Sequence, residues 1–578
     1  MALPILALGA TVEADTVNSI SGGEMSAQAH HSNQNVKLRR HVGPIGLLFA
    51  AIGSIIGSGW LFGAFNASVI AGPSALFSWL IAGGMILIIA LTYAELGPMF
   101  PIAGGVVRYP HLVWGSFTSF SLGFVTWIST VAVPAIETEG ALTYASKFLP
   151  FTTAAKDSGG VVHVLTPLGY AVAALLLAVF IVVNYFGVRL FAQINNVLVW
   201  WKLGVILIVI VVFIFTALTT STMGSPANFT SHGFAPGGVP GIFIAISTAG
   251  ITFSFLGFRQ GIELAGETTN PRRNIPLAVI GSVLITAVIY ALLQVAFTLG
   301  VPGSTLEHSD GWSKLTFAND FGPLAAISTL AGITWLAVLL YIDAVISPAD
   351  TGLVYTTIAS RVSYALGRNG NAPSWLTRNN RFGVPIWSLF VTFAAGLVIL
   401  LPFPSWQQLV GFITSATVIS FGVGPLVLGA LRREMPERER PFRLPGGDVI
   451  PLLAFYAANM IIYWGGWATN SKLFITILIG YVLLAIFQFT GRGSRNRPRL
   501  EFKAGAVWVL PWFVAMALIS WLCDPAAHPH LFFWVFLINA VVAVVIYYVA
   551  IRMRLPKDRV EAHIREAENE SSEEDVSV

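Results

Sequence analysis

The chain has 578 residues with a formal net charge of +4; 55% of them are hydrophobic, only 10% are charged, and the mean hydropathy is +0.75. This composition leaves too little polar surface to coat a soluble fold, so we expect the bilayer to be the solvent of this protein. One cysteine excludes a disulfide framework and no His/Cys spacing is typical of a metal site, so we predict no metal, no cofactor and no nucleic-acid partner.

The two ends of the chain are polar. Residues 1–42 lack the apolar core and cleavage site of a secretory signal, and we interpret them as a disordered cytoplasmic tail. Residues 556–578 are charged and could form a short amphipathic helix. We favour a solvated tail there, because such charge blocks usually stay disordered.

Between the tails lie about fourteen apolar stretches of the length that spans a membrane as a helix. We therefore predict an all-α polytopic membrane protein with about fourteen transmembrane helices. The stretches are 44–70, 73–97, 112–143, 168–187, 195–217, 241–267, 276–300, 322–358, 384–402, 407–431, 449–468, 473–490, 505–523 and 530–552.

Lysine and arginine residues fall almost entirely on one side when the connecting loops are assigned alternately to the two sides. The opposite side has only Lys147, Lys156, Lys314 and Lys472. Because cytoplasmic loops carry the excess of positive charge, this asymmetry predicts a multi-pass protein of the plasma membrane with both termini in the cytoplasm.

The first apolar stretch is interrupted by small residues. Gly57, Ser58 and Gly59 follow Gly53 and Ser54 in the middle of the span. Such a run frees backbone amides and carbonyls at membrane depth, and a half-helix beginning near Ser58 would point its N–H groups at an anion such as a substrate carboxylate. The alternative is close helix packing through small residues.

A second interruption, in residues 247–257, lies five helices after the first and contains Gly250, Phe253 and Gly257. Two broken helices at equivalent positions of consecutive five-helix units are typical of inverted-repeat transporters that bind their substrate at the midplane. We therefore predict a five-plus-five inverted-repeat core with repeats at 43–217 and 241–432, followed by four additional helices in 433–555.

Few ionisable residues lie inside the spans, and each is costly enough to suggest a function. Lys202 is a candidate proton carrier, or a lysine that reaches toward the interface, and spacing alone favours neither. Arg259 and Glu263 are spaced i, i+4, so they could pair with each other, or Arg259 could receive an acidic side chain.

The other intramembrane ionisable residues are acidic. Glu95 and Glu267 lie near cytoplasmic ends, where we expect them to pair with loop arginines as a gate or structural clamp. Asp343 could line the cavity, and no role is predicted for Glu137 or Glu139.

A series of short motifs occurs in a fixed order along the chain: Gly57-Ser58-Gly59, Tyr93-Ala94-Glu95-Leu96, Pro101-Ile102-Ala103-Gly104-Gly105, Asn195-Asn196, Phe255-Leu256-Gly257-Phe258, the run 266–276, Ser360-Arg361, the run 367–373 and Arg440-Pro441-Phe442-Arg443. In this order they resemble the amino acid–polyamine–organocation superfamily of transporters. Four further pieces, the run 57–62, Arg108-Tyr109-Pro110, Asp343-Ala344-Val345-Ile346-Ser347-Pro348 and Leu401-Pro402-Phe403-Pro404-Ser405-Trp406, most resemble the bacterial aspartate–proton symporter branch of that superfamily.

This resemblance implies the leucine-transporter-type fold. It implies that the amides of Ser58 and Gly59 hold the substrate α-carboxylate, and that carbonyls near Ser54-Ile55 and Phe253 take the α-amino group. It also implies that Phe253 is an aromatic lid and that the Lys202 amine replaces the sodium ion of sodium-coupled relatives. At Arg259 the chain departs from many relatives, so a side-chain preference is not carried over.

We therefore predict a secondary transporter that imports an amino acid by proton symport, with an acidic amino acid as the candidate substrate. An amino acid/amine exchanger and a membrane-embedded sensor remain alternatives. An enzyme is not expected, because the candidates include no converging nucleophile and base. No oligomeric state is predicted.

Overall fold

The computed structural model describes residues 42–102, 105–157, 161–186, 188–220, 223–265, 268–317, 322–403, 405–489 and 500–574. The predicted N-terminal tail therefore lies outside the described residues except for Val42. The main helices are α1 (Pro44–Ile55), α2 (Gly59–Ala71), α3 (Ala75–Met99), α4 (Gly105–Trp114), α5 (Ser116–Ala145), α6 (Pro167–Tyr185), α7 (Val188–Thr219), α8 (Gly238–Thr248), the 3-10 helix η3 (Phe253–Arg259), α9 (Gln260–Glu263), α10 (Pro271–Gly300), α11 (Gly303–His308), α12 (Pro323–Leu330), α13 (Thr334–Arg368), α14 (Ile386–Leu400), α15 (Trp406–Glu434), α16 (Val449–Trp464), α17 (Trp467–Phe489), α18 (Phe502–Leu522), α19 (Trp534–Arg552) and α20 (Lys557–Glu574).

The predicted helical membrane protein is confirmed, but the number of spans differs from the prediction. In the described ranges, ten helical segments are long and apolar enough to cross a membrane, or eleven when α8 is counted with η3 and α9, which are bent by 45° against it. The shorter apolar helices α1, α14 and α16 have only 12, 15 and 16 residues. The predicted stretch 44–70 is one reason for the difference, since its break divides it into α1 and α2.

One β-hairpin departs from the all-α prediction. Strands β1 (Thr153–Asp157) and β2 (Val161–Leu165) pair antiparallel in the connection between α5 and α6, with Thr153 opposite Leu165 and Ala155 opposite His163. The β-branched residues Thr153 and Val164 favour this extended conformation. Because the hairpin lies between two spans, it leaves the helical architecture unchanged.

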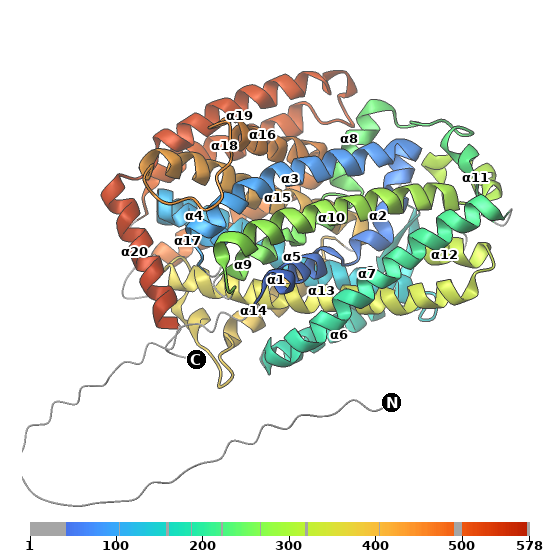
Figure 1. Cartoon of the computed structure of the whole chain (residues 1–578), viewed down its shortest axis with the longest axis horizontal. Helices are drawn as coiled ribbons and strands as arrows, with labels where there is room; N and C mark the ends of the chain where they lie inside the picture. The colour runs from blue at the N-terminus through green and yellow to red at the C-terminus, as the bar shows by residue number, and fades with distance from the viewer. Residues whose placement is uncertain are drawn as a thin grey trace, which may run out of the picture.

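The long helices run roughly along one direction and form a bundle in which some helices are central and others peripheral (Figure 1). Helices α5 and α15 are buried along almost their whole length. Large apolar side chains of the peripheral helices are exposed instead, including Leu175 of α6, Val211 of α7 and Leu478 of α17. An exposed apolar belt around a buried centre is the distribution that a bilayer solvent requires.

The C-terminal tail is ordered over most of its length, so the interpretation as a solvated tail is wrong there. Residues 557–574 form α20, whose Val560, Ile564 and Ala567 are buried. The helix lies at one end of the bundle beside α4 (Figure 1), where His563 stacks on His111 at 4.7 Å. Burial, together with the charges of His563 and Arg108, lowers the pKa of His111 to about 3. The contact is therefore made by a neutral His111 imidazole at physiological pH.

Candidate functional site

The first predicted break is present in the structure. Helix α1 ends at Ile55, Ile56 is extended with φ −87° and ψ 90°, and α2 starts at Gly59. The carbonyl groups that this break frees find side-chain donors: Tyr290 donates to the Ile55 carbonyl at 3.3 Å, and Thr351 donates to the Ile56 carbonyl at 3.2 Å. Polar side chains thus satisfy backbone groups that lipid could not.

The second break is also present and lies against the first. Helix α8 ends at Thr248, Gly250 adopts a left-handed φ of 87°, and the chain continues as η3. A Cβ atom on Gly257 would lie 2.2 Å from the carbonyl carbon of Ser54. Only glycine therefore allows the two interrupted helices to approach this closely.

The backbone amide of Ser58 already binds a carboxylate, which belongs to the protein itself. Ser58 N–H donates to Glu137 Oε2 of α5 at 2.7 Å. Glu137 is 1% exposed, and its second oxygen has no hydrogen-bond partner among the described residues. A Cβ atom on Gly57 would lie 2.5 Å from that second oxygen. The amide that the sequence offered to a substrate carboxylate is thus in contact with Glu137, to which the sequence assigned no role.

Aromatic side chains cover the Ser58 region. Trp406 donates its indole N–H to Ser58 Oγ at 2.8 Å, and its ring lies 4.8 Å from that of Phe62. Phe253 meets the Trp406 ring edge-on at 6.2 Å. Phe253 therefore lies beside the break, and its role as an aromatic lid stays a prediction. Trp406 also contacts the break, although the sequence showed it only as part of a family motif.

Lys202 is fully buried and has three oxygen partners. Its Nζ donates to the Gly53 carbonyl and to Thr351 Oγ1, both at 3.1 Å, and lies 2.6 Å from Asp350 Oδ2. Two of its N–H donors are therefore used in hydrogen bonds, and the Asp350 carboxylate lies close enough to balance its charge. The lysine is therefore not oriented toward the interface, and it joins the broken helix α1 to α13.

Asp343 lies two helical turns before Asp350 on α13, but other groups hold it. Its Oδ1 accepts from the Trp201 indole at 2.9 Å and from Ser347 Oγ at 2.7 Å. Its Oδ2 has no hydrogen-bond partner among the described residues, although the side chain is fully buried. Asp343 thus supports the tryptophan next to Lys202.

Arg259 ends η3 and pairs with Glu263. Its NH2 lies 3.0 Å from Glu263 Oε1, and its guanidinium carbon is 5.8 Å from the centre of the Phe421 ring. The side chain is 1% exposed, yet Nε and NH1 have no hydrogen-bond partner among the described residues. The helical pair considered from the spacing exists, and it leaves N–H donors of the arginine available.

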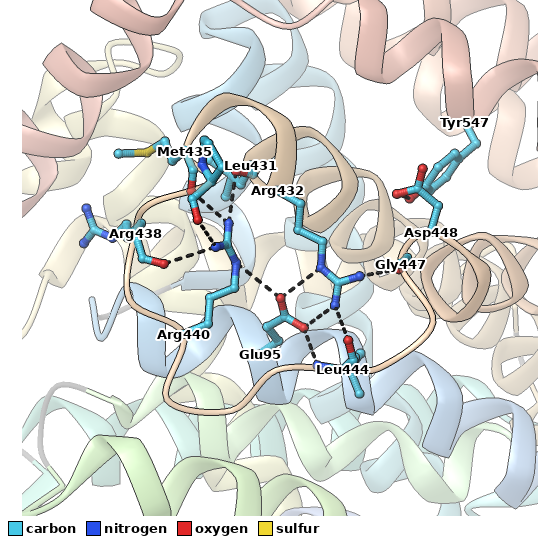
Figure 2. A network of polar contacts seen from close by, with 11 residues as sticks. Glu95, Leu431, Arg432, Met435, Arg438, Arg440, Leu444, Gly447, Asp448 and Tyr547 are labelled. Carbon is cyan, nitrogen blue, oxygen red and sulfur yellow. Dashed lines mark hydrogen bonds and ion pairs between the residues drawn. The ribbon is translucent and has the colours of Figure 1, made fainter.

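Glu95, near the end of α3, is the centre of a cluster of arginines from α15 and the loop after it (Figure 2). Arg432 Nε donates to its Oε1 at 3.0 Å, the Leu444 amide donates to its Oε2 at 2.8 Å, and Arg440 Nε lies 3.5 Å from its Oε1. These contacts tie α3 to the loop after α15. Glu267, which the sequence grouped with Glu95, lies outside the described residues.

Comparisons with known proteins agree on one family. A family model described as amino acid permease matches residues 42–489. The chain is 38% identical over 489 residues to the glutamate/serine transporter AimA of Bacillus subtilis (strain 168), covering 84% of this chain and 88% of that protein. It is 34% identical over 484 residues to the aspartate-proton symporter of the same organism, covering 82% and 89%. The branched-chain amino acid permease BcaP of that organism is 27% identical over 467 residues, covering 78% and 93%.

Proposed function

Because this chain belongs to the amino acid permease family of the amino acid–polyamine–organocation superfamily, and is therefore an amino acid transporter, we propose that it imports its substrate by proton symport and accepts acidic amino acids. The family implies the leucine-transporter-type fold, in which two broken helices surround the substrate. We place both termini in the cytoplasm, since the lysine and arginine asymmetry of the loops supports that orientation.

Proton coupling is supported mainly by the buried Lys202–Asp350 pair. The Lys202 amine takes three oxygen ligands from α1 and α13, in the place where the family resemblance puts the sodium ion of sodium-coupled relatives. Loss of a proton from this pair would remove its charge attraction and weaken the link to Gly53. A proton could thereby control whether the broken helix is held against α13.

The substrate assignment rests on two groups near the breaks. The Ser58 amide binds a carboxylate in this structure, which makes it a suitable place for the substrate α-carboxylate. Arg259 is a buried guanidinium whose Nε and NH1 have no hydrogen-bond partner in the part of the chain that the structure describes, which suits a second carboxylate. The names of two relatives include glutamate or aspartate, and one of these names also includes serine.

Uptake by the purified protein in proteoliposomes tests this proposal. We expect labelled glutamate, aspartate or serine to accumulate only with an inward proton gradient, and a protonophore to abolish that accumulation. Uptake that does not depend on the proton gradient but requires an amino acid or amine inside the vesicles would instead identify an exchanger and overturn the symport proposal.

Arg259→Ala should separate acidic from neutral substrates. The variant removes the guanidinium that we propose to pair with the side-chain carboxylate of the substrate. Loss of such a buried charged pair should lower kcat/KM for glutamate and aspartate by about thirtyfold or more. Serine has no such carboxylate, so its transport should stay close to that of the wild type. Transport rates for the three labelled amino acids measure this difference.

The matched control removes both charges at once. Arg259→Met/Glu263→Gln avoids leaving Glu263 buried without its partner, so it should fold like the wild type and still lose the acidic substrates. If serine and the acidic amino acids decline equally in this double variant, Arg259 serves only as a structural partner of Glu263.

A further inference from the structure

A pocket of about 580 Å³ opens beside the arginine cluster, away from the two helix breaks. It lies where the loop after α15 turns back to start α16 (Figure 2). Its lining includes Arg432, Arg433, Arg440, Arg443, Leu444 and Asp448. In the orientation proposed above, this pocket lies at the cytoplasmic face of the membrane.

The pocket carries an excess of positive charge. Its lining holds four arginines and one carboxylate, Asp448, and Glu95 adds a second carboxylate beneath it. Arg432 pairs with Glu95, and Arg433 pairs with Asp448. Arg440 shares Glu95 with Arg432, at 3.5 Å from its Nε, and Arg443 has no carboxylate partner among the described residues.

Arg440 shows the consequence of this excess. Its guanidinium donates mainly to backbone carbonyls at the end of α15, among them Leu431 and Met435. Carbonyl groups satisfy hydrogen bonds but do not neutralise a charge. Burial lowers the pKa of Arg440; the Glu95 carboxylate opposes this, and the charges of Arg443 and Arg432 add to it.

Arg443 is the arginine of the pocket that is ready for an external ligand. Its side chain is exposed, and within the described part of the chain it forms no hydrogen bond and no ion pair. A guanidinium group binds phosphate through two parallel N–H donors, which makes arginine a preferred residue for phosphate recognition. The chemistry of the pocket therefore suits a phosphate group.

The surface next to the pocket is apolar. Val449 and Leu453 lie one turn apart at the start of α16 and are 59% and 48% exposed. A free anion would make no favourable contact with these apolar side chains, whereas the acyl chain of a phospholipid would pack against them along the helix. Basic pockets between transmembrane helices at the cytoplasmic face suit the headgroups of anionic lipids.

We propose that this pocket binds the phosphate group of an anionic phospholipid of the cytoplasmic leaflet, with Arg443 as the guanidinium that contacts it. The lipid would lie against the loop whose Leu444 amide holds Glu95 together with the Arg432 side chain of α15, and so would brace the link between α3 and α15. The inference uses the orientation proposed above but does not depend on the transported substrate or on proton coupling.

Thermal unfolding of the full-length protein in detergent tests the inference without a transport assay. Added short-chain phosphatidylglycerol should raise the midpoint temperature of unfolding of the wild-type protein, and short-chain phosphatidylcholine should leave it unchanged. In Arg443→Gln the apparent affinity for phosphatidylglycerol should fall about tenfold or more, because one charged hydrogen-bond partner is lost. Arg378→Gln removes an exposed arginine of another loop and should behave like the wild type.

Three results would overturn the proposal. Inorganic phosphate could raise the midpoint as much as the lipid does, which would identify a site for a free anion. Phosphatidylcholine could act as strongly as phosphatidylglycerol, which would remove the role of charge. Arg443→Gln and Arg378→Gln could weaken the lipid effect equally, which would reflect general surface charge rather than this pocket.

Discussion

Lys202→Met is expected to abolish amino acid accumulation driven by a proton gradient, while substrate exchange between the two sides of the membrane continues. The methionine side chain fills much of the space of the lysine stem but carries no proton, so the link between the Gly53 carbonyl and Asp350 is lost. Labelled uptake with and without the gradient measures accumulation, and counterflow from preloaded vesicles measures exchange.

The single variant leaves Asp350 buried without its partner. Breaking a buried ion pair in this way lowers the free energy of unfolding by about 3–5 kcal/mol. Lys202→Met/Asp350→Asn removes both charges and controls for this loss of stability. It should show the same separation of exchange from accumulation. Accumulation in the double variant that still responds to a protonophore would contradict the role of Lys202 as proton carrier.

Lys202 also illustrates how far sequence reasoning reaches in this protein. A lysine in an apolar stretch is visible in the sequence, but its partners are not. Thr351 is 149 residues away on another helix, and only the packing of α7 against α1 and α13 brings these groups together. The sequence therefore predicted a buried amine as one of two alternatives, and the structure supplied the oxygen atoms that surround it.

The helix breaks were predictable because their cause is local. Glycine and serine in the middle of a span weaken the helix wherever the chain folds. Glu137 and Trp406 were not assigned to the break, since they reach Ser58 from 79 and 348 residues away. The partner of Glu95 could be predicted only as a class, loop arginines, because its contact with Arg432 of α15 spans 337 residues.

The prediction for the C-terminal helix α20 was wrong for a different reason. Val560, Ile564 and Ala567 have the i, i+4, i+7 spacing of one helical face, so the signal was present in the sequence. The acidic end of the tail favoured a solvated interpretation. What the sequence did not contain was the surface on α4 that buries this face.

Glu137→Gln is expected to remove the pH dependence of substrate binding. In the structure the Glu137 carboxylate occupies the Ser58 amide that we assign to the substrate. Two carboxylates cannot share one buried amide without strong repulsion, so Glu137 must accept a proton or move before the substrate enters. A neutral glutamine removes this repulsion. We expect the apparent KM in counterflow at pH 8 to fall about tenfold or more, the size of a charged hydrogen bond.

Glu139→Gln is the matched control for this experiment. Glu139 lies two residues further along α5 and is equally buried, and its carboxyl oxygens have no hydrogen-bond partner among the described residues. Its substitution should leave the pH dependence of KM unchanged. If Glu137→Gln keeps the wild-type pH dependence and weakens binding at every pH, the carboxylate instead serves to cap the first turn of α2. The substrate carboxylate would then have to bind elsewhere, because the Ser58 amide would be permanently occupied by the protein.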